Sequence, residues 1–185
     1  MNVKNEIENI YELTPLQKGI LFNKLNKDKG NDYHVQFEVE YDFQLDNDKV
    51  EMCMNLLNDK YEMLRTAFVI PKSTGVPKQV VLKHRSPEIH YLNGDVDMEQ
   101  IKTNDLDNPF DLQKDCLLRV YLINYPCSSK ILFSFHHIIM DGWSADKDAV
   151  QSSKITNEFA KRLGMSEEHA DGCDRRRICK TDSGV

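Results

Sequence analysis

Two adjacent histidines, His136 and His137, end an apolar run that begins at Ile131, and Asp141 and Gly142 follow shortly after. Imidazole is the side chain best suited to proton transfer near neutral pH. An apolar run that leads into turn-forming residues is typical of a buried strand, and neighbouring strand residues point to opposite faces. The two histidines therefore cannot share one role. Gly142 suits a turn that needs a positive φ or a close backbone approach. The pattern indicates a candidate catalytic turn, and a pair of core histidines with satisfied hydrogen bonds is the structural alternative.

Composition indicates one globular domain of 185 residues, with 40% hydrophobic and 29% charged residues. The net charge of −6 argues against nucleic acid as a partner. No stretch is long enough to span a membrane and the N-terminus has no apolar signal core, so we expect a cytoplasmic protein without a membrane partner. The five cysteines are scattered, and we expect them to be reduced. His169, Cys173 and Cys179 fit no zinc spacing, so we expect no metal.

Local signals place the N-terminal elements that precede the histidines. Thr14, Pro15 and Gln17 predict a capped helix start, and the helix is expected to run to about residue 26 with Leu16, Ile20 and Leu21 on one side. Alternation over residues 35–41 predicts a strand whose odd-numbered residues are buried. A second helix follows a cap at residue 46 or 47, with a core stripe of Val50, Met54, Leu57 and Tyr61 flanked by Cys53 and Leu56.

The remaining elements are mostly strands. We expect a hairpin of residues 65–70 and 78–82, with its turn at residues 72–75, and a further strand at residues 89–92. A short helix is expected over residues 97–106. The strand at residues 117–125 most simply pairs antiparallel with the strand that carries His136 and His137. Helices combined with mainly antiparallel strands predict an α+β, two-layer fold.

Residues 136–142, which read HHIIMDG, match the HHxxxDG signature of nonribosomal peptide synthetase condensation domains and of chloramphenicol acetyltransferase. Three further segments resemble condensation domains in the family order. They are residues 13–22 (LTPLQKGILF), residues 60–68 (KYEMLRTAF, which departs from RHExLRTxF at its first two positions) and the PFDL segment with its following Leu-x-Arg, in residues 108–120. The resemblance implies one chloramphenicol acetyltransferase-like lobe, with a mainly antiparallel sheet and packed helices.

The resemblance implies an activity that forms an amide bond between an acyl or peptidyl thioester and an aminoacyl thioester. Both substrates arrive on the phosphopantetheine arms of carrier proteins in neighbouring synthetase modules, and the domain itself binds no cofactor. By resemblance His137 is catalytic, either as a general base or as a group that orients the amine and stabilises the tetrahedral intermediate. His136 would be structural, Asp141 would pair with Arg65, and Gly142 would give room beside the thioester. An exposed Arg65 at the strand end is the alternative to that salt bridge.

The resemblance stops after Ser144, so we divide the chain into an N-terminal lobe, residues 1–144, and a divergent tail, residues 145–185. A complete condensation domain has a second lobe, and a truncated or frame-shifted gene would give a chain of this kind. We expect the isolated chain to be inactive because that lobe is missing. Two alternatives stay open: a compact CoA-dependent acyltransferase that acts as a trimer, and a non-catalytic carrier-binding remnant.

Overall fold

The computed structural model describes residues 6–26, 32–94 and 96–139. Over these residues the elements are β1 (Ile7–Glu12), α1 (Pro15–Asn26), β2 (His34–Tyr41), α2 (Asn47–Lys60), η2 (Glu62–Arg65), β3 (Thr66–Val69), β4 (Lys78–Leu82), β5 (Glu88–Asn93), α3 (Met98–Leu106), β6 (Leu118–Asn124), β7 (Ser129–His136) and η3 (His137–Ile139). The predicted α+β class is confirmed, and the predicted tail lies outside the described residues.

Helix starts follow the sequence signals closely. The capping box before α1 is formed, since Gln17 Oε1 accepts from Thr14 N at 2.9 Å and Thr14 Oγ1 accepts from Gln17 N at 3.2 Å. Asp46 caps α2, and Asp97 caps α3 in the same way, by accepting from backbone N–H groups of the first turn. These caps need only residues close in sequence, which is why the sequence alone predicted the caps of α1 and α2, and for α3 the start of the helix.

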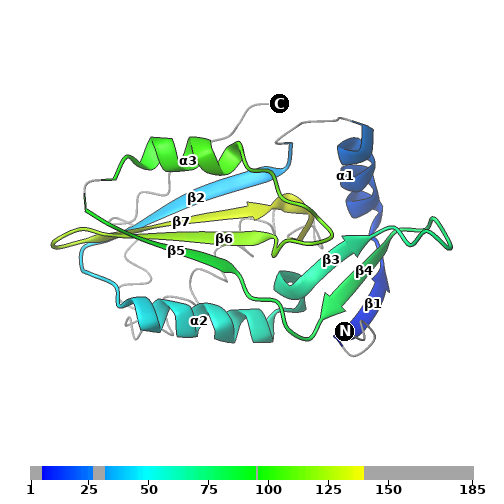
Figure 1. Ribbon diagram of the computed structural model, residues 1–185, viewed down its shortest axis with the longest axis horizontal. Helices are drawn as coiled ribbons and strands as arrows, with labels where there is room; N and C mark the ends of the chain where they lie inside the picture. The colour runs from blue at the N-terminus through cyan, green and yellow to red at the C-terminus, as the bar shows by residue number, and fades with distance from the viewer. Residues whose placement is uncertain (1–5, 27–31, 95, 140–185) are drawn as a thin grey trace.

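The strands form two sheets that meet near the end of β7 (Figure 1). One sheet has the order β1-β4-β3 and the other has the order β2-β7-β6-β5. The predicted hairpin is confirmed because β3 and β4 pair antiparallel, and β6 pairs antiparallel with β7 as expected. β5 and β6 are parallel, and β1 was not predicted at all.

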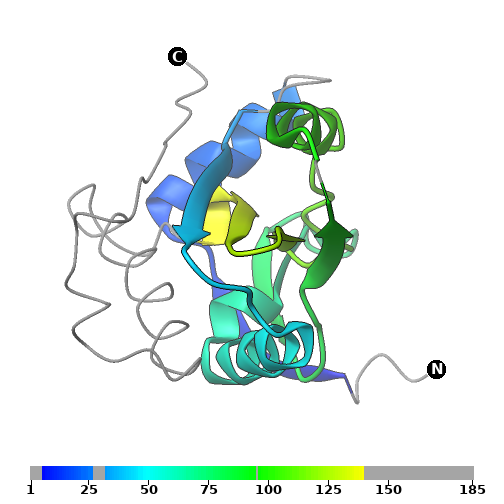
Figure 2. The same ribbon diagram turned by 90° about the vertical axis from the view of Figure 1, so that its left-hand side faces the viewer.

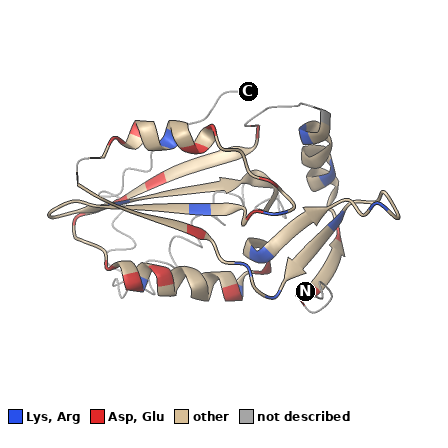
Figure 3. Cartoon of the chain, in the orientation of Figure 1, with Lys and Arg blue, Asp and Glu red and all other residues tan. Residues whose placement is uncertain are grey.

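Helices α3 and α2 lie on opposite sides of the four-stranded sheet (Figure 2). The face toward α2 carries the main apolar core, to which β2, β6 and β7 contribute together with the stripe of α2. Its members include Val39, Val50, Met54, Leu57, Leu118, Val120, Leu122, Ile131, Phe133 and Phe135. The described basic residues are scattered over both sheets and all three helices (Figure 3).

Three sequence expectations are wrong in detail. Leu16 is 56% exposed although Ile20 and Leu21 beside it are buried, so the buried side of α1 is narrower than predicted. Gln36 is buried on the supposedly wet face of β2 because α3 covers that face, and its Nε2 donates to the Lys102 carbonyl at 3.1 Å. Arg65 ends η2 instead of beginning β3.

Candidate active site

His137 lies at the turn where β7 ends and the two sheets meet. His136 is the last residue of β7 and is paired with His34 of β2, and His137 begins η3. The backbone N–H of His137 donates to the Tyr33 carbonyl at 2.7 Å. His137 is partly exposed, whereas His136 is 2% exposed. The two neighbours thus differ in solvent access, and His137 is the more exposed of the two.

His136 is held as a neutral imidazole. Burial lowers its pKa to about 3, and the nearby charges of Lys24, His34 and His137 act in the same direction. Its Nδ1 accepts from the backbone N–H of Ile138 at 3.2 Å, which places the ring proton on Nε2. A neutral, buried ring of this kind supports the turn and does not exchange protons with solvent near neutral pH.

Lys24 brings a positive charge toward this turn from the end of α1. Its Nζ donates to the Phe110 carbonyl, and the Phe110 ring lies edge-on to His136 with centroids 6.4 Å apart. Desolvation lowers the pKa of Lys24, and the carboxylates of Asp111 and Asp115 oppose that effect. The sequence analysis did not single out Lys24, because nothing local indicates its distant partners.

The turn is also tied to α1 and to the three-stranded sheet through Gln17. Gln17 Nε2 donates to the Ile138 carbonyl at 3.2 Å, and Gln79 of β4 donates to Gln17 Oε1 at 2.8 Å. From the sequence, Gln17 was predicted to cap a helix, within a segment that resembles a family motif. Its long-range contacts carry no local signal.

Arg65 is buried, with 5% exposure, which excludes the exposed-arginine alternative. Its guanidinium donates to Glu8 Oε2 and to the Leu82 carbonyl, each at 2.6 Å, and to the Asn58 carbonyl at 2.9 Å. These contacts join β1, β4 and α2. Asp141 and Gly142 lie outside the described residues, so the Arg65–Asp141 salt bridge stays a prediction.

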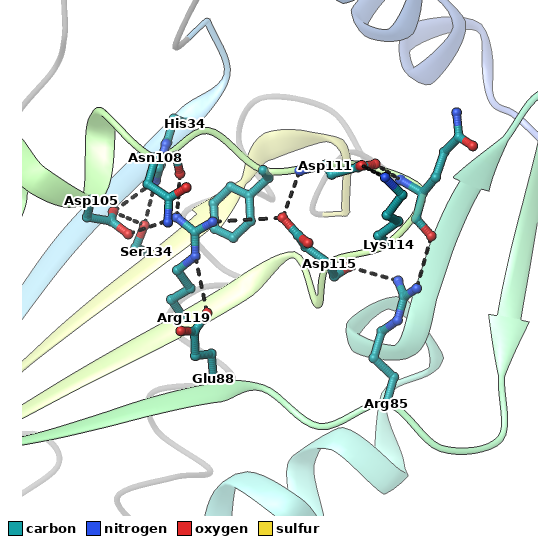
Figure 4. Close-up of polar contacts among 12 residues, drawn as sticks. His34, Arg85, Glu88, Asp105, Asn108, Asp111, Lys114, Asp115, Arg119 and Ser134 are labelled. Atoms are coloured by element: carbon teal, nitrogen blue, oxygen red, sulfur yellow. Dashed lines mark hydrogen bonds and ion pairs between the residues drawn. The ribbon is translucent and has the colours of Figure 1, made fainter.

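A second polar cluster, which we call the Asp105 network, lies under α3. Asp105 Oδ2 is 2.9 Å from His34 Nε2, accepts from Gln36 Nε2 at 2.6 Å, and also accepts from Ser134 Oγ. Asp105 Oδ1 accepts from Arg119 Nη1 at 3.1 Å and from the Tyr121 hydroxyl at 2.8 Å. Figure 4 shows the Arg119 guanidinium between Asp105 and Glu88.

Burial alone would raise the pKa of Asp105, but hydrogen bonds from His34, Ser134 and Gln36 outweigh it and hold the pKa below its usual range. The cluster contains serine, histidine and aspartate, yet it is not a catalytic triad. In a triad the histidine uses one nitrogen toward serine and the other toward aspartate. Here His34 Nε2 faces both Ser134 and Asp105, and the Asp105 side chain has no exposure. The network therefore has a structural role.

This network supports the ring that packs against His136. The Arg119 guanidinium lies over the Phe110 ring at 4.0 Å, and His34 and Phe110 have centroids 4.8 Å apart. Arg119 Nη1 also donates to the Asn108 carbonyl at 2.6 Å, which fixes the segment that leads to Phe110. Figure 4 shows a second anchor of the chain before β6, Arg85, which donates to the Asp115 carbonyl at 2.8 Å. The site thus rests on contacts that the sequence did not reveal.

Within the described part of the chain, no group of three or more His, Cys, Asp or Glu side chains could hold a metal ion. The trio His169, Cys173 and Cys179 lies outside that part. None of the described helices has the length and apolar character needed to cross a bilayer.

Comparisons with known proteins agree with the motifs. A family model described as "Condensation domain" matches residues 7–146. The chain is 36% identical over 147 residues to a plipastatin synthase subunit from Bacillus subtilis (strain 168), and the match covers 75% of this chain and 6% of that protein. It is 35% identical over 154 residues to gramicidin S synthase 2 of Brevibacillus brevis, and that match covers 76% of this chain and 3% of that protein.

Solved structures show the same fold. The condensation domain of the monacolin K polyketide synthase MokA has a TM-score of 0.73 at 12% identity, over 86% of this chain and 35% of that chain. The four-domain nonribosomal peptide synthetase AB3403 has a TM-score of 0.67 at 21% identity, over 85% of this chain and 12% of that chain. The chain therefore spans well under half the length of these relatives.

Proposed function

We propose that this chain, which belongs to the condensation-domain family, supplies the histidine-bearing lobe of a site that forms amide bonds in nonribosomal peptide synthesis. The observation that carries the proposal is the partly exposed His137, at the end of β7 beside the buried, neutral His136. The similar proteins are synthetases, which favours this function over a compact acyltransferase that acts as a trimer.

In the proposed reaction, the amine of a carrier-bound aminoacyl thioester attacks the carbonyl carbon of a carrier-bound acyl or peptidyl thioester. A C–N bond forms, the C–S bond breaks, and the thiol of the donor's phosphopantetheine arm leaves with a proton. His137 either accepts the proton from the attacking ammonium or holds the amine and stabilises the tetrahedral intermediate by hydrogen bonding. The domain itself holds no cofactor in this scheme, and its partners are carrier proteins and neighbouring modules.

Residues 1–144 form the lobe and residues 145–185 a divergent tail in this proposal, which the family match over residues 7–146 supports. Because the chain corresponds to only 35% of the MokA condensation domain chain and 42% of another solved condensation domain, we propose that a second lobe must complete the substrate channel. The isolated chain should then form little or no amide from two loaded carrier proteins. Mass spectrometry of the carriers measures this directly.

A chimera tests the function itself. Residues 7–146 replace the matching segment of the plipastatin synthase condensation domain, to which the chain is 36% identical. We expect amide formation by the chimera and a loss of at least about 100-fold when His137→Ala is introduced, since acid–base groups contribute roughly 10²–10⁴-fold. A folded chimera with equal activity with and without His137 would refute the catalytic assignment. Carrier binding without chemistry would favour the non-catalytic alternative.

A further inference from the structure

The Gln17 side chain has more contacts than a helix cap requires. It is 5% exposed in the first turn of α1. Its Oε1 accepts from Thr14 N at 2.9 Å, which completes the capping box, and also from Gln79 Nε2 at 2.8 Å. Its Nε2 donates to the carbonyl of Ile138 at 3.2 Å, across 121 residues of sequence. The amide therefore joins the start of α1 to the turn that carries His137.

The hydrogen bond from Gln17 to the Ile138 carbonyl lies next to His137 in that turn. Ile138 directly follows His137, and the N–H of His137 itself donates to the Tyr33 carbonyl at 2.7 Å. One anchor thus holds the peptide group before the His137 Cα, and the other holds the carbonyl of the next residue. Anchoring the backbone on both sides limits the direction in which the imidazole leaves it, and reactive groups need placement within about 0.5 Å.

Helix α1 contacts the residues that supply both anchors. Gln17 reaches the turn directly, and Asn23 Nδ2 donates to the Tyr33 hydroxyl at 2.8 Å. Tyr33 has φ of 71°, and it is the one residue other than glycine with positive φ in the part of the chain that is described. Backbone in this region is held by its surroundings and is found at functional sites. Helix α1 therefore braces the turn from its first and its third turns.

The residue type separates the two tasks of Gln17. A capping box accepts glutamate or glutamine equally, because only an acceptor oxygen is needed. The contact with the Ile138 carbonyl requires a donor, which a carboxylate lacks. We propose that Gln17 is a positioning residue for His137, acting through the Ile138 carbonyl. This inference rests on the proposed function only in taking His137 as the reactive group.

The test uses NMR of the full chain with labelled histidine, in which His137→Ala identifies the His137 signals. Gln17→Glu keeps the acceptor for the cap and removes the donor, and Gln17→Met removes both without adding a charge. The matched control is Thr14→Ala, which loses the cap contact to Gln17 N and leaves the Ile138 contact in place. The readouts are the His137 ring shifts and the exchange rate of its backbone amide.

We expect both Gln17 variants to move the His137 ring signals and to speed exchange of its amide by roughly 2- to 13-fold, the factor that one net hydrogen bond corresponds to. Thr14→Ala should leave both readouts as in the wild type. Unchanged His137 signals in a folded Gln17 variant overturn the proposal, as does an equal change in Thr14→Ala.

The wild-type chain supplies a measurement that does not depend on the variants folding. The Gln17 side-chain amide protons should show nuclear Overhauser contacts to Ile138, and their absence overturns the proposal. None of these readouts requires amide formation, so they separate this inference from the proposed function. An inactive chimera with an intact Gln17 effect would refute only the function, and the reverse result would refute only the positioning role.

Discussion

Replacing Asp105 by asparagine tests whether the Asp105 network holds the fold together. The substitution keeps the shape and removes the charge next to Arg119, and breaking a buried pair from one side costs about 3–5 kcal/mol. The lower end applies here because Arg119 keeps the Asn108 carbonyl at 2.6 Å and has Glu88 at 3.6 Å. The new amide also faces the donor Gln36 Nε2, and one unsatisfied buried donor costs about 1–3 kcal/mol.

Together these terms give a loss of about 4 kcal/mol for Asp105→Asn at pH 7. With a urea dependence near 2 kcal/mol per M, the unfolding midpoint should fall by about 2 M. Circular dichroism during urea titration measures it. Asp107→Asn is the matched control, because it removes the same charge from an exposed position at the end of α3 and should change stability by less than about 0.5 kcal/mol.

The pH dependence gives this prediction a second part. The folded pKa of Asp105 is depressed, so its charge stabilises the fold above the unfolded value of about 3.9, and that contribution is lost as the pH falls toward the folded value. The difference between the wild type and Asp105→Asn should be full above about pH 5 and should narrow below about pH 4. Equal midpoints at pH 7 would show that the network contributes no net stability. A difference that does not change with pH would show that the charge of Asp105 is not the source of its contribution.

Three further outcomes follow from the same structure. Arg65→Met should lower the free energy of unfolding by roughly 3 kcal/mol because it leaves three acceptors without their donor. Lys72→Met removes a charge from an exposed position and should leave the free energy of unfolding unchanged. Equal urea midpoints for the two variants would contradict this prediction. Tyr33→Gly should be more stable than Tyr33→Ala by about 1 kcal/mol because φ is positive at this position. The control site is Asn55, which is exposed in α2, and there Asn55→Ala should be more stable than Asn55→Gly. If alanine were the more stable residue at both sites, the backbone of Tyr33 would not be strained. His136 should stay neutral in NMR titrations down to about pH 4. Because its folded pKa lies below the unfolded value of about 6.5, the free energy of unfolding should fall by up to about 1.4 kcal/mol per pH unit below pH 6.5. The variant His136→Gln should show a flatter dependence of stability on pH.

The sequence located those features that depend on neighbours in the chain. Thr14, Asp46 and Asp97 cap helices through contacts two or three residues away, and the turn at residues 72–75 closes the hairpin around Gly75, which has φ of 66°. Such contacts are formed by short segments with characteristic residue types, so a pattern is enough to find them. The apolar run from Ile131 and the turn residues after it placed His137 at a strand end for the same reason.

Features that depend on distant segments could not be read in this way. Gln36 looks like a solvent-facing residue until α3 covers it, and Asp105 looks like a surface residue of an amphipathic helix. Gln17 shows its capping role in sequence and its contact with Ile138 only in three dimensions. The chemistry of each residue was visible, but its partners were set by a topology in which a parallel pair, β5 and β6, was not expected.

The position of β7 in its sheet has a consequence for how the chain folds. β7 lies between β2 and β6, so β2 has no neighbour in the four-stranded sheet until the last described strand is present. The pairing of β2 with β7 joins residues about 100 apart in the sequence, as in the His34–Ser134 contact. Pairings of such long range slow folding, and unpaired strand edges are prone to aggregate. During synthesis, β2 would leave the ribosome early and wait for almost the whole lobe to be translated. A chaperone that shields an exposed strand edge would therefore help most in the interval before residue 129 emerges.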